Sequence, residues 1–199
     1  MGWFGPSKDE VWRQLSQEIG ADFIEGGFWK GNKVQVHVKH WTITLDTCTD
    51  SNGESSIAYT RMRAPYINRE GFRFKIDRKC ILSWLGKLLG MQDIEVGDPD
   101  FDEAFIIQGN DESRVRDLFA HPFIRQTIQA QPKIQLELKD NEAWFGQRLP
   151  DSADVLHFQV IGVIKDVERL KALFDLFAAV LDQLCRIGSA YKQKPEAEL

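Results

Sequence analysis

Cysteine is scarce in this sequence of 199 residues, and its distribution argues against a disulfide framework. The three cysteines, Cys48, Cys80 and Cys185, are odd in number and far apart, and none belongs to a CxxC pair. Such a pattern is typical of proteins that fold in a reducing compartment. We therefore expect a cytoplasmic protein whose fold depends on its core and not on covalent cross-links.

Long hydrophobic runs are also missing. The most apolar stretch, 170–184, is interrupted by Lys171, Asp175 and Asp182. A helix that crosses a bilayer needs roughly 18–20 consecutive apolar residues, and no run reaches that length. The N-terminus carries neither a basic segment nor a long apolar segment, so a signal peptide is not expected. We expect no insertion into a membrane.

The sequence lacks the motifs of the common enzyme classes. GxGxxG, GxxxxGK[ST], GxSxG and HExxH do not occur. His37 and His40 are three residues apart on a predicted strand, so their side chains point to opposite faces and cannot chelate one ion. His157 lies between two apolar positions of another strand and is expected to face solvent. The sequence therefore predicts no catalytic residue and leaves enzymatic activity open.

Basic residues are fewer than acidic ones: the chain has 25 Lys and Arg and 30 Asp and Glu, which gives a net charge of −5. A chain with this balance has no general attraction to nucleic acid, so nucleic acid is not an expected partner. Hydrophobic residues make up 43% and charged residues 28%, as in ordinary globular proteins. We expect one compact domain over 1–190, with possible halves at 1–90 and 91–190, and a flexible tail over 191–199.

Hydrophobic periodicity predicts an α+β fold. Ser7 and Glu10 form a capping box before a helix, and Asp166 caps the last helix. Strands are predicted where apolar and polar residues alternate. The expected helices are 8–19, 81–90, 111–119, 122–130 and 166–187, and the expected strands are 34–38, 41–45, 55–63, 71–78, 104–108, 134–138 and 156–160. We expect curved antiparallel β-meanders with an N-terminal helix, a central helix pair, and a long C-terminal helix packed on the sheet.

A basic region follows two predicted strands that we expect to pair as a hairpin over 59–79, joined by a loop at 64–68. Its side chains alternate so that several cations and one aromatic ring share a face: Tyr59, Arg61, Arg63, Arg73 and Lys75. Such a face is a candidate binding site for a partner of opposite charge. The structural alternative is a solvated sheet face whose cations pair with acidic residues.

An acidic loop over 93–103 is the candidate metal site. Asp98, Asp100 and Asp102 have the spacing that opens a calcium loop, but Glu103 and Gly109 occupy the positions that require Gly and Glu. A looser divalent-cation site remains open, because clustered carboxylates suit hard cations. The alternative is a solvated loop, followed by a helix that Asn110 caps.

The stretch 101–112, from Phe101-Asp102-Glu103-Ala104-Phe105 to Asn110-Asp111-Glu112, resembles a pattern found in a group of uncharacterised bacterial proteins. The pattern continues into Arg114 and the pair Leu118-Phe119, so it covers roughly 95–140. The similar proteins often carry membrane helices ahead of this region, which this chain does not. The resemblance implies a bacterial origin and assigns no activity to any residue.

Two classes of function follow. The first is a non-enzymatic binding or protein-interaction module, whose hairpin 59–79 and loop 93–103 meet a protein partner or a second copy of the chain. The second is a divalent-metal-dependent hydrolase that uses the acidic loop 93–103.

Overall fold

The computed structural model describes residues 5–27, 31–51, 56–69, 71–79, 92–140 and 153–192. Within these ranges the chain forms five helices and one ten-stranded sheet in which every pair of neighbouring strands is antiparallel. The predicted α+β fold class is therefore confirmed. The predicted helix 81–90, Cys80 and the last seven residues of the predicted tail lie outside the described residues.

Two of the five described helices begin at the predicted capping residues Ser7 and Asp166. The helices are α1 (Lys8–Ile19), α2 (Pro99–Ala104), α3 (Glu112–Phe119), α4 (Pro122–Gln129) and α5 (Val167–Arg186). In α1 both hydrogen bonds of the capping box form between Ser7 and Glu10, and Gly20 ends the helix with a φ of 65°. The side chain of Asp166 accepts a hydrogen bond from the backbone N–H of Arg169 at the start of α5.

Seven of the ten described strands overlap the predicted ones, whereas β1, β6 and β10 were not predicted. The order in the sheet is β1-β2-β3-β4-β9-β8-β5-β7-β6, with β10 paired to β4. The strands are β1 (Asp22–Ile24), β2 (Lys33–Val38), β3 (Trp41–Ser51), β4 (Ser56–Asn68), β5 (Phe74–Arg78), β6 (Gln92–Asp93), β7 (Phe105–Gly109), β8 (Gln135–Lys139), β9 (Ala153–Ile161) and β10 (Ala190–Tyr191). The first four strands form a meander, in which β2, β3 and β4 were expected, β1 was not, and the expected member β5 is missing.

The predicted hairpin between the fourth and fifth strands is wrong. β9 and β8 lie between β4 and β5, so the two basic strands are not neighbours. The predicted loop at 64–68 is also wrong, because β4 continues to Asn68 and pairs with β9 there. Pro65 suggested a break, but a proline lacks only one N–H and the neighbouring residues still form the ladder.

Three smaller predictions also need correction. The predicted acidic loop over 93–103 includes Asp93 of β6 and most of the short helix α2. Asp111, and not Asn110, is the N-cap of α3. Tyr191, which was expected to begin the flexible tail, pairs with Ile67 in β10.

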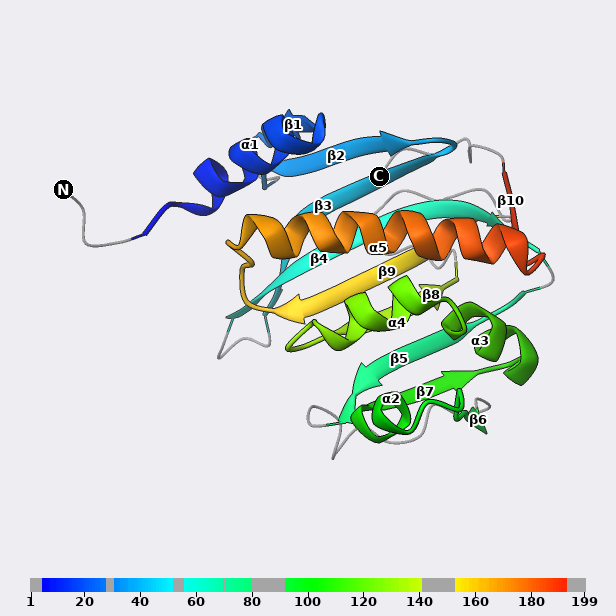
Figure 1. Cartoon of the computed structure of the whole chain (residues 1–199). Coiled ribbons are helices and arrows are strands. Elements are labelled where there is room, and N and C mark those ends of the chain that lie inside the picture. The colour runs from blue at the N-terminus through cyan, green and yellow to red at the C-terminus, as the bar shows by residue number, and fades with distance from the viewer. Residues whose placement is uncertain are drawn as a thin grey trace.

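The helices cover one face of the sheet. In Figure 1, α5 and α4 cross in front of the central strands, α1 lies near β1 and β2, and α3 lies beside α4. An apolar row on this face crosses eight strands, each member paired with the next: Phe23, Val34, Leu45, Met62, Phe158, Leu136, Ile76 and Ile107. The core thus lies between this row and the helices, and the opposite face, called the open face below, carries no helix among the described residues.

Candidate functional site: the open face of the sheet

A polar row crosses the open face from one edge of the sheet to the other. Side chains alternate between the two faces of a strand, so the residues next to the apolar row point to the open face. Each member pairs with the next in register: Asp22, Gln35, Thr44, Arg63, His157, Glu137, Lys75, Gln108 and Asp93. Nine successive strands therefore each contribute a polar side chain at the same level.

Asp46 organises the positive charge on β4. It lies opposite Arg61 and accepts hydrogen bonds from Arg61 Nε at 2.8 Å and Arg61 Nη2 at 2.7 Å. Arg63 Nη2 donates a third hydrogen bond to the same carboxylate at 2.6 Å. Charge-assisted contacts of this kind hold long side chains in one geometry. Both arginines are consequently fixed against the sheet.

His157 is almost completely buried, with 3% of its surface exposed, so the expectation that it faces solvent is wrong. Burial, followed by the positive charges of Lys139, Arg61 and Arg63, lowers its pKa to about 2. Its ring nitrogen Nδ1 is 3.7 Å from Glu137, too far for a hydrogen bond, and Lys139 engages that carboxylate at 3.1 Å. The imidazole is therefore neutral at physiological pH.

These six residues form what we call the central cluster: Asp46, Arg61, Arg63, His157, Glu137 and Lys139. They come from β3, β4, β9 and β8, the middle of the sheet. Three cations stand against two carboxylates, because the histidine is neutral. Counted over these six residues alone, the central cluster has one excess positive charge, and its side chains are largely held in place, with Arg61 and Lys139 also interacting outside the cluster.

The structure brings some of the predicted binding residues together and separates others. Tyr59 lies on the same face of β4 as Arg61 and Arg63, opposite Cys48. Lys75 belongs to the polar row on the same face, but two strands separate it from Arg63. Lys75 is 3.3 Å from Asp77, whose pKa is raised by burial despite this contact. The open face therefore replaces the predicted hairpin as the surface that these residues share.

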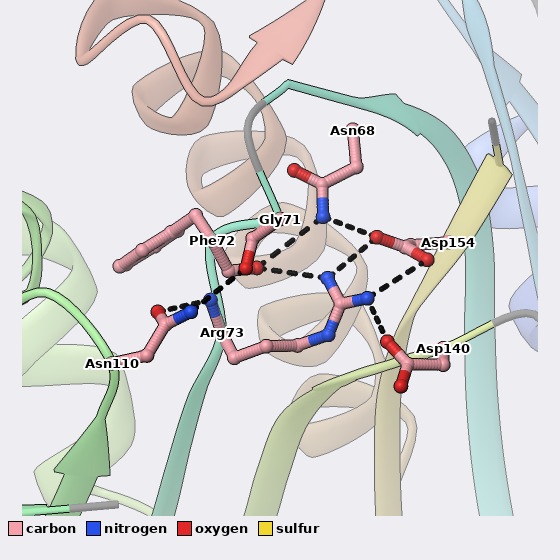
Figure 2. Close-up of polar contacts among 7 residues, drawn as sticks. All are labelled: Asn68, Gly71, Phe72, Arg73, Asn110, Asp140 and Asp154. Atoms are coloured by element: carbon pink, nitrogen blue, oxygen red, sulfur yellow. Dashed lines mark hydrogen bonds and ion pairs between the residues drawn. The ribbon is translucent and has the colours of Figure 1, made fainter.

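Arg73 lies elsewhere and fastens the crossing from β4 to β5 (Figure 2). Its guanidinium donates to Asp154 at the start of β9, with Nη1 at 2.6 Å and Nη2 at 3.3 Å. It also pairs with Asp140, which follows β8, and donates to the backbone carbonyl of Phe72 at 3.0 Å. Asn68 donates to the same Asp154 carboxylate from the end of β4. Arg73 is a structural clamp over the ends of four strands.

Asn110 completes the clamp from the other side (Figure 2). Its side chain accepts from the backbone N–H of Arg73 at 2.8 Å and donates to the carbonyl of Gly71 at 2.8 Å. The residue expected to cap a helix therefore fixes the turn before β5. Tyr66, opposite Asp154 in the register, is fully buried, and burial followed by the negative charge of Asp154 raises the pKa of its hydroxyl.

The three aspartates of the predicted metal site do not converge. Asp98 caps α2 and pairs with Arg125, at 3.3 Å in each contact. Asp102 accepts from the backbone N–H groups of Val96 and Gly97. Asp100 lies exposed in the first turn of α2. In the described part of the chain, no three His, Cys, Asp or Glu side chains group as metal ligands.

Sequence reasoning missed Asp46, His157, Glu137 and Lys139 as site residues. Asp46 had a usable signal, because β3 and β4 are consecutive strands whose register places it opposite Arg61. Burial raises the pKa of the thiol of Cys48, close to the central cluster, so this cysteine is a poor nucleophile. The central cluster consequently offers binding groups without an activated nucleophile.

Comparison with known proteins supports the fold and assigns no activity to the chain. No protein-family model and no curated protein matches the sequence. A solved structure, that of the mycobacterial trehalose monomycolate transport factor A, TtfA, matches with a TM-score of 0.54 and 8% identity. The match covers 96% of this chain and 98% of that chain. The likeness therefore extends over the whole α+β body and shows a shared fold.

None of the described helices is both long and apolar enough to cross a membrane.

Proposed function

We propose that this chain is a non-enzymatic interaction module that binds an acidic segment of a partner protein on the open face of its sheet. The observation that carries the proposal is the central cluster, which combines an excess positive charge with side chains already fixed by cross-strand contacts. A prearranged charged surface loses little conformational entropy on binding, and charge complementarity selects its partner.

The placement of the remaining groups supports binding over catalysis. Two of the three aspartates of the alternative hydrolase, Asp98 and Asp102, are engaged by backbone N–H groups or by Arg125. The structural neighbour is named as a transport factor, a description that fits a non-enzymatic role. A bacterial origin, which the resemblance over 95–140 implies, remains part of the proposal.

The test uses octaglutamate as the probe and backbone amide NMR of the whole chain as the readout. We expect shift changes concentrated on β4, β9 and β8 at low ionic strength, and their loss as salt rises. Octalysine at the same concentration is the matched control and should leave these amides unchanged. Absence of shifts with millimolar octaglutamate, or shifts confined to the helices, would refute the proposal.

Two charge reversals sharpen the test. Lys139→Glu changes the excess charge of the central cluster, so octaglutamate affinity should fall by about tenfold or more. Lys133→Glu makes the same change at an exposed position whose carbonyl contacts Arg169 of α5, and affinity should be retained. If the open-face amides instead broaden with protein concentration before peptide is added, the occupant is a second copy and the acidic-segment proposal fails.

A further inference from the structure

Two buried nitrogens on the open face lack a hydrogen-bond partner, and they lie on paired residues. Among the described side chains of that face, these atoms are Arg63 Nε and His157 Nδ1. Arg63 and His157 are directly opposite in the register of β4 and β9. Side chains of such pairs have Cβ atoms about 4.5–5.5 Å apart. One small acceptor group can therefore reach both nitrogens.

The surrounding side chains do not satisfy either nitrogen. Arg63 contacts Asp46 through Nη2, which leaves Nε for another acceptor. The carboxylate of Glu137 stays 3.7 Å from His157 Nδ1 and is engaged by Lys139. A buried donor without an acceptor is destabilising, so an acceptor delivered by a ligand gains more here than on an ordinary polar surface.

The net charge of the central cluster indicates which chemical group would accept hydrogen bonds from the two nitrogens. The central cluster carries one excess positive charge, which a single carboxylate neutralises. A phosphate group carries about −1.5 to −2 at neutral pH and would leave a buried excess of negative charge. Arg63 Nε can only donate, and a neutral imidazole donates from Nδ1 when the proton resides there. Two N–H donors beside one excess positive charge match one carboxylate.

We propose that Arg63 Nε and His157 Nδ1 each donate one hydrogen bond to a single carboxylate from the acidic segment. The inference rests on the proposed function, since the carboxylate belongs to that segment. Both nitrogens are shielded in the free chain, so binding displaces a neighbouring side chain. Lys139, 34% exposed, is the most exposed member of the central cluster, so we expect it to be the side chain that the ligand displaces.

The direct experiment follows the side-chain nitrogens of the unaltered chain by ¹⁵N NMR while octaglutamate is added. We expect His157 Nδ1 to be the protonated ring nitrogen, and its resonance and that of Arg63 Nε–H to move as peptide binds. The wild-type measurement needs no substitution, so it decides the matter even where a variant fails to fold. Peptide binding with both resonances unmoved would overturn the inference.

Variants give an independent readout. His157→Phe removes the ring nitrogens, and Arg63→Lys removes Nε–H while keeping the charge, so each should weaken octaglutamate binding about tenfold. Gln159→Leu alters a polar residue on the same face of β9 and should leave affinity unchanged. If the peptide binds the open face with equal affinity to all three variants, this inference fails and the proposed function stands. If the peptide does not bind that face at all, both fail.

Discussion

At the scale of single residues, His157 shows how burial among cations determines a protonation state. Its pKa of about 2 in the folded chain lies far below the value of about 6.5 expected in the unfolded chain. Between these two pH values the unfolded state binds one more proton than the folded state. His157 therefore makes the protein progressively less stable as the pH falls below about 6.5.

This linkage predicts the pH dependence of a substitution. His157→Gln should reduce the loss of stability between pH 7 and about pH 4.5 by about 2 kcal/mol, because glutamine takes up no proton. Urea unfolding at the two pH values measures the difference, and His40→Gln, at an exposed turn, is the control. An identical loss in wild type and His157→Gln would show that His157 is not the group that opposes folding in acid.

The clamp residue Arg73 illustrates the cost of leaving a buried charge without its partner. Arg73→Ala leaves the carboxylate of Asp154, 9% exposed, with Asn68 alone, and we expect a loss of about 3–5 kcal/mol in the free energy of unfolding. Arg116→Ala removes an arginine whose ion pair with Glu112 is half exposed, and it should cost less than about 1 kcal/mol. Chemical denaturation compares them, and equal losses would contradict the clamp.

At the scale of elements, close packing between β7 and α3 depends on a glycine. A Cβ at Gly109 would fall 2.6 Å from Val115 Cγ2 and 3.1 Å from the backbone oxygen of Arg73. Gly109→Ala should therefore destabilise the chain by about 1–3 kcal/mol, seen as a lower midpoint in thermal unfolding. Gly27→Ala, where no atom lies within 4 Å of the added Cβ, is the matched control.

A second substitution separates the two contacts at Gly109. Val115→Ala in the Gly109→Ala background removes the side-chain clash and retains the backbone contact, so it should recover part of the loss relative to Val115→Ala alone. Additive effects of the two substitutions would mean that Gly109 and Val115 do not touch in solution.

Local signals predicted individual elements well, because the forces involved act within a few residues. The capping box at Ser7 located α1, and alternation located β2, β5 and β9. Strand partners were harder to predict. Consecutive strands usually pair, which suggested a hairpin of β4 with β5, but the pairing of β4 with β9 depends on packing between segments far apart in the chain.

In the candidate site, likewise, local patterns could select some residues, whereas others depend on the pairing of distant strands. Arg61 and Arg63 could be selected from their alternation on one strand, and Asp46 could have been placed by the pairing of the consecutive strands β3 and β4. His157 joins them only through the pairing of β9 with β4, which no local pattern reports. Arg73 was selected as a binding residue because its charge is visible in the sequence, whereas its carboxylate partners come from distant strand ends.

At the scale of the whole molecule, the sheet is most protected in its middle. β4 and β9 have neighbours on both sides and the helix layer on one face, whereas β6 is a two-residue edge strand. Native-state hydrogen exchange should therefore be slowest for hydrogen-bonded amides near Met62 and Phe158 and much faster for Asp93. Comparable protection at the centre and at the β6 edge would contradict the described strand order.

Because β4 and β9 are neighbours in the sheet, the segment between them, which holds β5 to β8, is attached to the rest of the chain at two adjacent points. The polypeptide leaves the first half of the sheet at Asn68 and re-enters at Ala153, which is paired with Ile67, so exit and return lie about one strand spacing apart. Everything that β5 to β8 contribute, including Glu137 and Lys139, arrives between those two points. Exchanging that segment for one of different sequence would change two of the six residues of the central cluster and leave Asp46, Arg61, Arg63 and His157 in place, so partner preference can be altered without rebuilding the meander.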